Sequence, residues 1–209
     1  METIPDNAGP YELSRPAWDV ALLFPSQGDW SEAEYLGLDT NRLVELVDGN
    51  LEVLSMPTLS RQLIVQCLFD MLRTFGKAKQ IGKVLFAPLP IRIREKTFRE
   101  PDLFVFAGEK VQPTDRFLKD AKLVVEVVSP DDKSHKRDYE DKRRDYAQLG
   151  IPEYWIVDPQ LLRITVLALD GKQYRVQGEF APGEQAASVL LPGFAVDVSA
   201  VFEAGTKLS

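Results

Sequence analysis

Hydrophobic positions along the chain switch between strand-like and helix-like spacing, a mixture that predicts an α/β domain. Residues 42–47 and 50–56 predict two strands, and Asp48-Gly49 between them favours a tight hairpin turn. The spacing then becomes helical, and one apolar stripe predicts a long helix from Thr58. Its members are Leu63, Ile64, Cys67, Leu68, Met71, Leu72 and Phe75.

Further strands are predicted at residues 83–87, 90–94, 103–106 and 123–128. The last run contains five aliphatic residues and one charged residue, Glu126. Such a run is typical of a strand that is buried on both faces. A carboxylate in that position is costly to desolvate unless a positive group compensates it. Glu126 is therefore a candidate functional group.

A charged helix is predicted after this strand, because residues 129–132 read Ser-Pro-Asp-Asp and supply a strand end and an acidic first turn. Asp138, Lys142 and Tyr146 on this helix are four residues apart and share one face. A buried Glu126 followed by an inward-facing Lys142 is a plausible active-site layout. The alternative is a solvated Glu126 on an edge strand, followed by an ordinary surface helix.

The remainder of the chain completes one domain over residues 31–209, after an irregular, proline-containing arm at residues 1–30. Ser31 and Glu34 form a capping box for a short helix at residues 32–36. A further strand, a second hairpin with Asp170-Gly171 at its turn, a late strand and a terminal helix follow. They are placed at 153–157, 163–169 with 173–177, 188–191, and near Phe202.

Composition removes several kinds of chemistry. Cys67 is the only cysteine and His135 the only histidine, so an internal disulfide is impossible and zinc or histidine-based sites are disfavoured. The net charge of −7 means that nucleic acid would need a local basic surface or a bridging metal ion. The candidates for such a surface are Arg92, Arg94, Lys136, Arg137 and Arg143. Neither a signal peptide nor a membrane span is recognisable, so we expect a cytoplasmic protein without a membrane partner.

Asp102 and Glu126 each lie on or beside an apolar strand, and they suggest metal-dependent hydrolysis. Without histidine, cleavage of a phosphodiester needs a divalent ion that activates water and neutralises developing charge. Mg²⁺ suits this role, with Mn²⁺ as a substitute, because it takes oxygen ligands from one or two carboxylates, substrate phosphate and water. A nearby amine can orient the attacking water.

Several short motifs follow one another in a characteristic order. They are Glu45-Leu46-Val47-Asp48-Gly49, Pro101-Asp102, Val125-Glu126-Val127-Val128-Ser129-Pro130, the spacing Asp138-x3-Lys142-x3-Tyr146, and Gly150-Ile151-Pro152-Glu153-Tyr154-Trp155-Ile156-Val157-Asp158-Pro159. With this set the chain resembles the Uma2-like branch of restriction-type endonucleases in the PD-(D/E)XK nuclease superfamily. The resemblance covers most of the chain and implies a restriction-endonuclease-like mixed β-sheet flanked by helices, with N- and C-terminal β-hairpins.

The resemblance also implies roles for individual residues. Asp102 and Glu126 would bind the metal, with the carbonyl of Val127 as a third ligand and Glu45 as an additional carboxylate. The literal lysine of the motif would stand at position 128, where this chain has Val128, so Lys142 on the next helix is the candidate amine. A second departure is Arg61-Gln62, where related sequences often carry His-Gln.

Two functions therefore compete. The first is a Mg²⁺-dependent endonuclease that hydrolyses DNA, with Asp102, Glu126 and Lys142 as catalytic residues and a homodimer as a plausible assembly for cutting both strands. The second is a catalytically inactive protein that keeps the nuclease fold as a binding or assembly module. The position of Lys142 separates them: it should approach the carboxylates in the first case and face solvent in the second.

Overall fold

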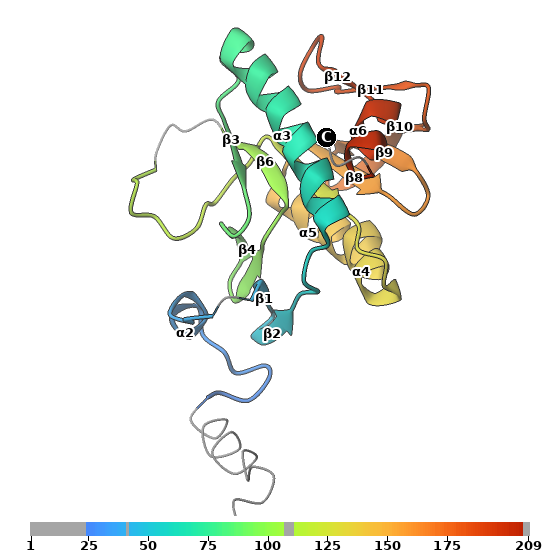
Figure 1. Ribbon diagram of the computed structural model, residues 1–209. Coiled ribbons are helices and arrows are strands. Elements are labelled where there is room, and N and C mark those ends of the chain that lie inside the picture. Colours follow the sequence, from blue (N-terminus) through green and yellow to red (C-terminus); the bar gives the residue numbers. More distant parts are fainter. Residues whose placement is uncertain (1–23, 41, 107–110, 207–209) are drawn as a thin grey trace, which may run out of the picture.

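A six-stranded mixed sheet forms the centre of the computed structural model, which describes residues 24–40, 42–106 and 111–206 (Figure 1). The strand order is β10-β9-β8-β7-β6-β3. The strands are β3 (Lys83–Phe86), β6 (Leu103–Phe106), β7 (Leu123–Val127), β8 (Glu153–Asp158), β9 (Arg163–Asp170) and β10 (Gln173–Phe180). Only β7 and β8 pair in parallel within this sheet. A parallel pair requires a crossover, and here the crossover is helical.

The crossover consists of α4 (Asp132–Lys136), a π-helical turn η1 (Arg137–Asp141) and α5 (Lys142–Leu149). The Asp131 side chain caps its start by accepting a hydrogen bond from the Ser134 amide, as the acidic residues at this point predicted. Gly150 ends it in the left-handed conformation, with φ of 85°. The π turn was not predicted, because its extra residue leaves no mark on the hydrophobic spacing. Such turns are frequent at functional sites.

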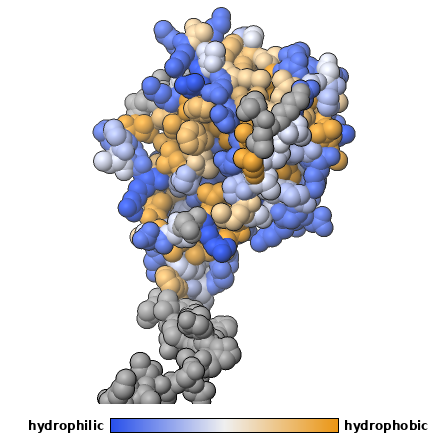
Figure 2. Space-filling model, in the orientation of Figure 1, coloured by the Kyte–Doolittle hydropathy of each residue, from blue (hydrophilic) through white to orange (hydrophobic). Residues whose placement is uncertain are grey.

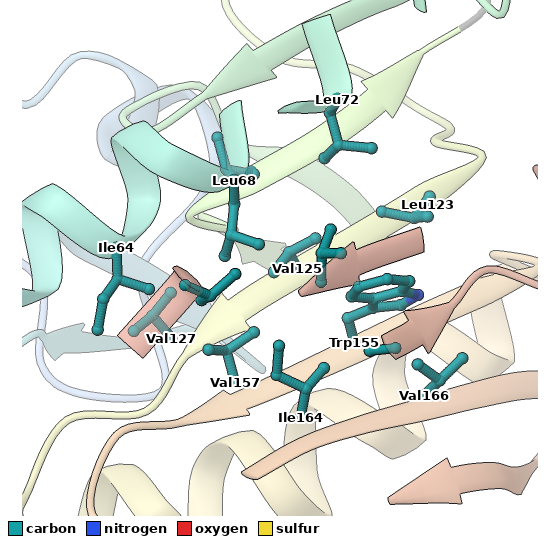
Figure 3. Close-up of a cluster of buried hydrophobic side chains, with 14 of the residues drawn as sticks. Ile64, Leu68, Leu72, Leu123, Val125, Val127, Trp155, Val157, Ile164 and Val166 are labelled. Atoms are coloured by element: carbon teal, nitrogen blue, oxygen red, sulfur yellow. The ribbon is translucent and has the colours of Figure 1, made fainter. Parts of the chain in front are cut away.

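Helices α3 (Leu59–Lys79) and α6 (Val198–Ala204) cover one face of the sheet. Figure 3 shows Ile64, Leu68 and Leu72 of α3 directed towards the strands that carry Val125 and Trp155. These α3 residues recur at every fourth position and are nearly fully buried, which confirms the predicted apolar stripe. The crossover helices cover the other face, where Val124 packs with Tyr146 and Tyr154. Glu126 alternates with Val125 along β7 and therefore belongs to this second face.

A smaller antiparallel sheet, in the order β2-β1-β5-β4, carries another part of the site. Its strands are β1 (Val44–Val47), β2 (Asn50–Val53), β4 (Ile91–Arg94) and β5 (Thr97–Arg99). The hairpin predicted at Asp48-Gly49 is confirmed. So is the capping box of α2 (Glu32–Leu36). Strand β5 was missed, because three residues with two polar side chains give no apolar run.

The strand predicted at residues 188–191 is wrong. The strands here are β11 (Gln185–Ala187) and β12 (Ala195–Asp197), and residues 188–194 connect them. The amides of Val189 and Leu190 donate to the Glu153 carboxylate, at 2.8 and 2.6 Å. Their backbone donors are therefore satisfied by a side chain and not by a neighbouring strand. Of the apolar residues that suggested a strand, Leu191 is buried and Val189 is exposed.

The surface in Figure 2 mixes both kinds of residue, with hydrophobic residues gathered near the middle of the visible face and hydrophilic ones along much of its edge. In the part of the chain that the structure describes, none of the helices is long and apolar enough to cross a membrane. Most of the predicted N-terminal arm, residues 1–23, lies outside the described residues.

Candidate active site

Glu126 of β7 and Lys142 of α5 meet in the interior. Lys142 Nζ lies 2.8 Å from Glu126 Oε1, and both side chains are almost completely buried. The Tyr146 hydroxyl donates to the same Glu126 oxygen at 2.6 Å. The shared helix face of Lys142 and Tyr146 therefore points inward, towards the sheet, as the four-residue spacing predicted. Lys142 therefore does not face solvent, which is the position that the hypothesis of a catalytically inactive module predicted.

Lys142 is shared by two further carboxylates. Its Nζ lies 3.1 Å from Glu45 Oε1 on β1 and 3.7 Å from Asp138 Oδ1 on the preceding π turn. Burial by itself would lower the pKa of Lys142, but Glu126, Glu45 and Asp138 outweigh burial and hold that pKa above its ordinary value. Lys142 is therefore a charged ammonium group at the centre of three acids.

The three acids are not equivalent. Burial tends to raise the pKa of Glu45, yet Lys142 and Arg99 overcome this and lower it to about 2. Burial also raises the pKa of Glu126, Lys142 opposes the rise only in part, and the nearby charges of Asp102, Asp138 and Glu45 bring it to about 8. Two environments thus separate two glutamates that bind the same lysine, a pattern that is common at functional sites.

Asp102 lies at the start of β6 and joins the group from the adjacent strand. Its Oδ2 accepts a 2.7 Å hydrogen bond from the amide of Val127, which fixes the carboxylate beside the end of β7. Arg61 of α3 places its Nη2 2.7 Å from both Asp102 oxygens. We refer to Glu45, Asp102, Glu126, Asp138, Arg61 and Lys142 as the charge cluster.

Further buried charged residues bind this cluster, and the sequence did not predict them. Arg99 of β5 is 1% exposed, and it binds Glu45 at 2.8 Å and Asp145 of α5 at 2.7 Å. Asp145 also receives a hydrogen bond from Arg94 at the surface. The available signal was position: Arg99 stands just before the Pro101-Asp102 motif, and Asp145 lies one helical turn after Lys142.

The acids of the cluster keep unused oxygens. Glu126 Oε2 and Asp138 Oδ2 are buried and have no hydrogen-bond donor. An unsatisfied buried acceptor costs free energy, and a cation would remove that cost. Among the residues that the structure describes, no three His, Cys, Asp or Glu side chains form a metal-binding group. The donor chemistry still fits Mg²⁺, which binds proteins through one or two carboxylates and completes its shell with other oxygens.

Glu45 differs from Glu126, because both of its oxygens are engaged. Oε1 lies 3.1 Å from Lys142 Nζ and accepts from the Glu100 amide at 2.9 Å. Oε2 accepts from Arg99 at 2.8 Å. In this arrangement Glu45 positions Lys142, and ligation of a metal by Glu45 stays a prediction.

Most of the basic residues proposed to meet nucleic acid are engaged within the protein. Arg92 pairs with Glu32, Arg94 with Asp48 and Asp145, Arg137 with Asp138, and Arg143 donates to the carbonyl of Tyr174. Lys136 is exposed on α4. The basic surface predicted from sequence is therefore smaller than the number of arginines suggested.

The mixed sheet, its helical crossover and the carboxylates gathered at the end of β7 define a nuclease-fold protein. A family model described as "Uma2: Putative restriction endonuclease" matches residues 31–199, and the chain belongs to this family. Similarity in structure extends to the crystal structure of "a putative nuclease belonging to DUF820" from Anabaena variabilis, with a TM-score of 0.69. The two share 17% sequence identity over 87% of this chain and 99% of that chain, so the likeness concerns the fold. No curated protein matches the chain.

In the absence of metal, the Glu126→Gln variant should become more stable relative to wild type as the pH rises. The folded protein holds the Glu126 proton more tightly than the unfolded chain, since its pKa is about 8 against an ordinary value of 4.5. This carboxyl therefore stabilises the fold at low pH, and that contribution is lost as the pH rises towards 8. Glutamine never ionises, so the difference in Tm between variant and wild type should grow between about pH 5 and 9. Each 1 kcal/mol corresponds to roughly 2–4 °C.

Thermal melts of both proteins in EDTA across this pH range test the expectation. Asp70→Asn is a suitable control, because Asp70 is half exposed on α3. A Glu126→Gln protein that is less stable by the same amount at every pH would instead identify Glu126 as a structural partner of Lys142.

Proposed function

We propose that this protein is a metal-dependent endonuclease of the PD-(D/E)XK type that hydrolyses phosphodiester bonds in DNA. The observation that carries the proposal is the buried Lys142 ammonium, 2.8 Å from Glu126 and 3.1 Å from Glu45, beside the carboxylate of Asp102. A lysine in this position is costly to bury. Membership of a family described as restriction endonucleases supports DNA as the substrate.

Three groups would hold the metal: the Asp102 carboxylate, Oε2 of Glu126 and the carbonyl of Val127. When bound, Mg²⁺ would neutralise charge on the scissile phosphate and make an attacking water more acidic. The Val127 amide fixes Asp102 at the end of β7. The Tyr146 hydroxyl and Lys142 both bind Oε1 of Glu126 and leave Oε2 free to serve as a ligand.

Lys142 would orient the attacking water and stabilise negative charge as the phosphate is attacked. Glu45 and Asp138 keep its ammonium in place and charged. This pre-organisation matters, because a group that is already positioned pays no reorganisation cost during the reaction. Glu45 acts here through Lys142, as a positioning residue.

A second candidate function is a binding or assembly module without catalysis. It is favoured by the closure of the charge cluster, since Arg61 already neutralises Asp102 and Lys142 already neutralises Glu126. A cluster that satisfies itself could simply stabilise the fold. The two functions differ in one respect. Only in the first do the binding of divalent metal and the cleavage of DNA depend on Asp102 and Glu126.

Nicking of supercoiled plasmid DNA distinguishes them. Wild-type protein is expected to convert the plasmid to nicked or linear forms with Mg²⁺ or Mn²⁺ and not with EDTA. Asp102→Asn and Glu126→Gln should each lower the rate by about 100-fold or more, the loss typical of one pre-organised electrostatic group. Asp70→Asn is the matched control on the surface. Cleavage that persists in EDTA, or in both variants, would contradict the proposal.

The assembly and location that we propose follow from this activity. A homodimer would place two sites on the two strands of a duplex, and two-fold symmetry suits that task. Cytoplasmic DNA would be the accessible substrate. Sedimentation of the protein with and without a DNA duplex tests the dimer directly.

A further inference from the structure

Arg61 is, together with Asp102, the least buried member of the charge cluster. It lies in the first turn of α3, and its amide donates to the Thr58 side chain that caps the helix. Its side chain is 11% exposed and that of Asp102 is 10% exposed, whereas Lys142 and Glu126 behind them are 2% and 0% exposed. Arg61 and Asp102, which bind each other, are thus the members of the cluster that solvent reaches. A ligand that binds the Asp102 carboxylate must share it with the Arg61 guanidinium or displace that guanidinium.

Arg61 also holds the position at which a cation would bind Asp102. Its Nη2 lies 2.7 Å from Asp102 Oδ1 and from Oδ2, and Nη1 donates to the Ser129 hydroxyl at 2.9 Å. Among the described residues, the only other hydrogen-bond donor to the Asp102 carboxylate is the Val127 amide. A divalent ion on the same carboxylate would stand beside a positive guanidinium, and the two charges repel.

Buried polar atoms of Arg61 and of the carboxylates in the charge cluster lack a hydrogen-bond partner. Arg61 Nε is a buried donor without an acceptor, while Glu126 Oε2 and Asp138 Oδ2 are buried acceptors without a donor. A cation held by Asp102 and Glu126 would satisfy Glu126 Oε2. An anion with several oxygens, such as a phosphate, would satisfy the guanidinium, which binds phosphate through paired N–H donors. The unsatisfied atoms therefore match a metal ion and a phosphodiester that bind together.

We infer that Arg61 is a gate that couples the binding of metal to the binding of substrate. In the free protein its guanidinium takes the place of the divalent ion at Asp102. When a phosphodiester reaches the site, Arg61 transfers to a phosphate oxygen, and Asp102 becomes available to the metal. The inference rests on the proposed function, since it assigns the same site a phosphodiester and a divalent ion.

Such a gate has a reciprocal consequence. If DNA removes Arg61 from Asp102, DNA must tighten metal binding, and metal must tighten DNA binding by the same factor. Metal alone should bind weakly, because it competes with the resident guanidinium. The protein would therefore bind its metal mainly when nucleic acid is already bound to it. Hydrolysis would then be restricted to the bound substrate.

Mn²⁺ binding, followed by the electron paramagnetic resonance signal of the free ion, tests the gate without any cleavage. Arg61→Gln removes the charge and keeps a hydrogen-bond donor near Asp102, so it should bind Mn²⁺ roughly tenfold more tightly than wild type, within the usual range of coupling. A phosphorothioate DNA duplex, which resists hydrolysis, should tighten Mn²⁺ binding by wild type about 5–150-fold. In Arg61→Gln most of that enhancement should vanish.

Two control variants accompany the test. Arg61→Lys keeps the positive charge and should retain weak Mn²⁺ binding. Arg73→Gln removes an exposed arginine from the same helix, one that pairs with Asp70, and should behave as wild type. Thermal melts establish that each variant is folded at the temperature used.

The outcomes separate this inference from the proposed function. If wild type cleaves plasmid with Mg²⁺ but Arg61→Gln binds Mn²⁺ no more tightly, the gate is refuted and the nuclease stands. If Arg61→Gln binds Mn²⁺ more tightly while wild type cleaves nothing, competition between Arg61 and metal is supported and the nuclease fails. If neither protein binds Mn²⁺, with or without the duplex, both are refuted.

Discussion

Lys142→Met is expected to lower plasmid nicking by at least about 100-fold, the loss associated with one pre-organised donor. Methionine nearly preserves the length of the side chain but removes the ammonium that lies between Glu126 and Glu45. The carboxylates proposed to bind metal remain. Mn²⁺ binding should therefore survive while the rate falls, and the measurement is the nicking rate at saturating metal.

Removal of Lys142 also leaves Glu45 and Glu126 buried without their shared cation, which is itself destabilising. The double variant Lys142→Met/Glu45→Gln removes one of these uncompensated charges and should recover stability without recovering cleavage. Lys133→Ala is the control, because Lys133 is exposed on α4 and ends the triplet Asp131-Asp132-Lys133, which matches the Asp-x-Lys part of the nuclease motif in its literal form. Cleavage that is lost in Lys133→Ala and retained in Lys142→Met would show that the amine is wrongly assigned.

The largest loss of stability is expected for Arg99→Met. Arg99 is 1% exposed between Glu45 and Asp145, which are 0% exposed, so its removal takes a buried cationic partner from each carboxylate. Glu45 then keeps Lys142 as a cationic partner, and Asp145 keeps Arg94 at the surface. Breaking a buried ion pair in this way costs about 3–5 kcal/mol. For a domain of this length that corresponds to a fall in Tm of roughly 6–20 °C. Thermal and urea unfolding in EDTA measure the change without a contribution from metal.

Arg73→Met is the control for charge alone, since Arg73 and Asp70 form a half-exposed pair on α3. Pairs of that kind contribute about 0–1 kcal/mol. Adding Asp145→Asn to Arg99→Met should restore part of the lost stability, because it removes the charge of one of the two carboxylates that have lost Arg99. An Arg99→Met variant with the same Tm as wild type would contradict this expectation. It would mean that solvent reaches the ion-pair network and that the network does not rigidify the site.

The sequence predicted the architecture well wherever a local pattern carried the information. The apolar run of β7, the stripe of α3 and the Asp48-Gly49 turn each specify their element through spacing and burial. The prediction failed at residues 188–191, where an apolar segment forms a turn held by Glu153. It also missed β5, which is stabilised by pairing with β1 and β4 and not by its own composition.

For the site, the sequence by itself determined the candidates: carboxylates placed on apolar strands, and Lys142 on the same helix face as Asp138 and Tyr146. These follow from the two local periods of strand and helix. Only the tertiary structure decided the pairing. Arg61 meets Asp102 across 41 residues and Arg99 meets Glu45 across 54. Contacts between residues so far apart in the sequence depend on how the two sheets and α3 pack together. Coulomb attraction between buried groups acts through space. The spacing of residues along the chain therefore could not reveal these pairs.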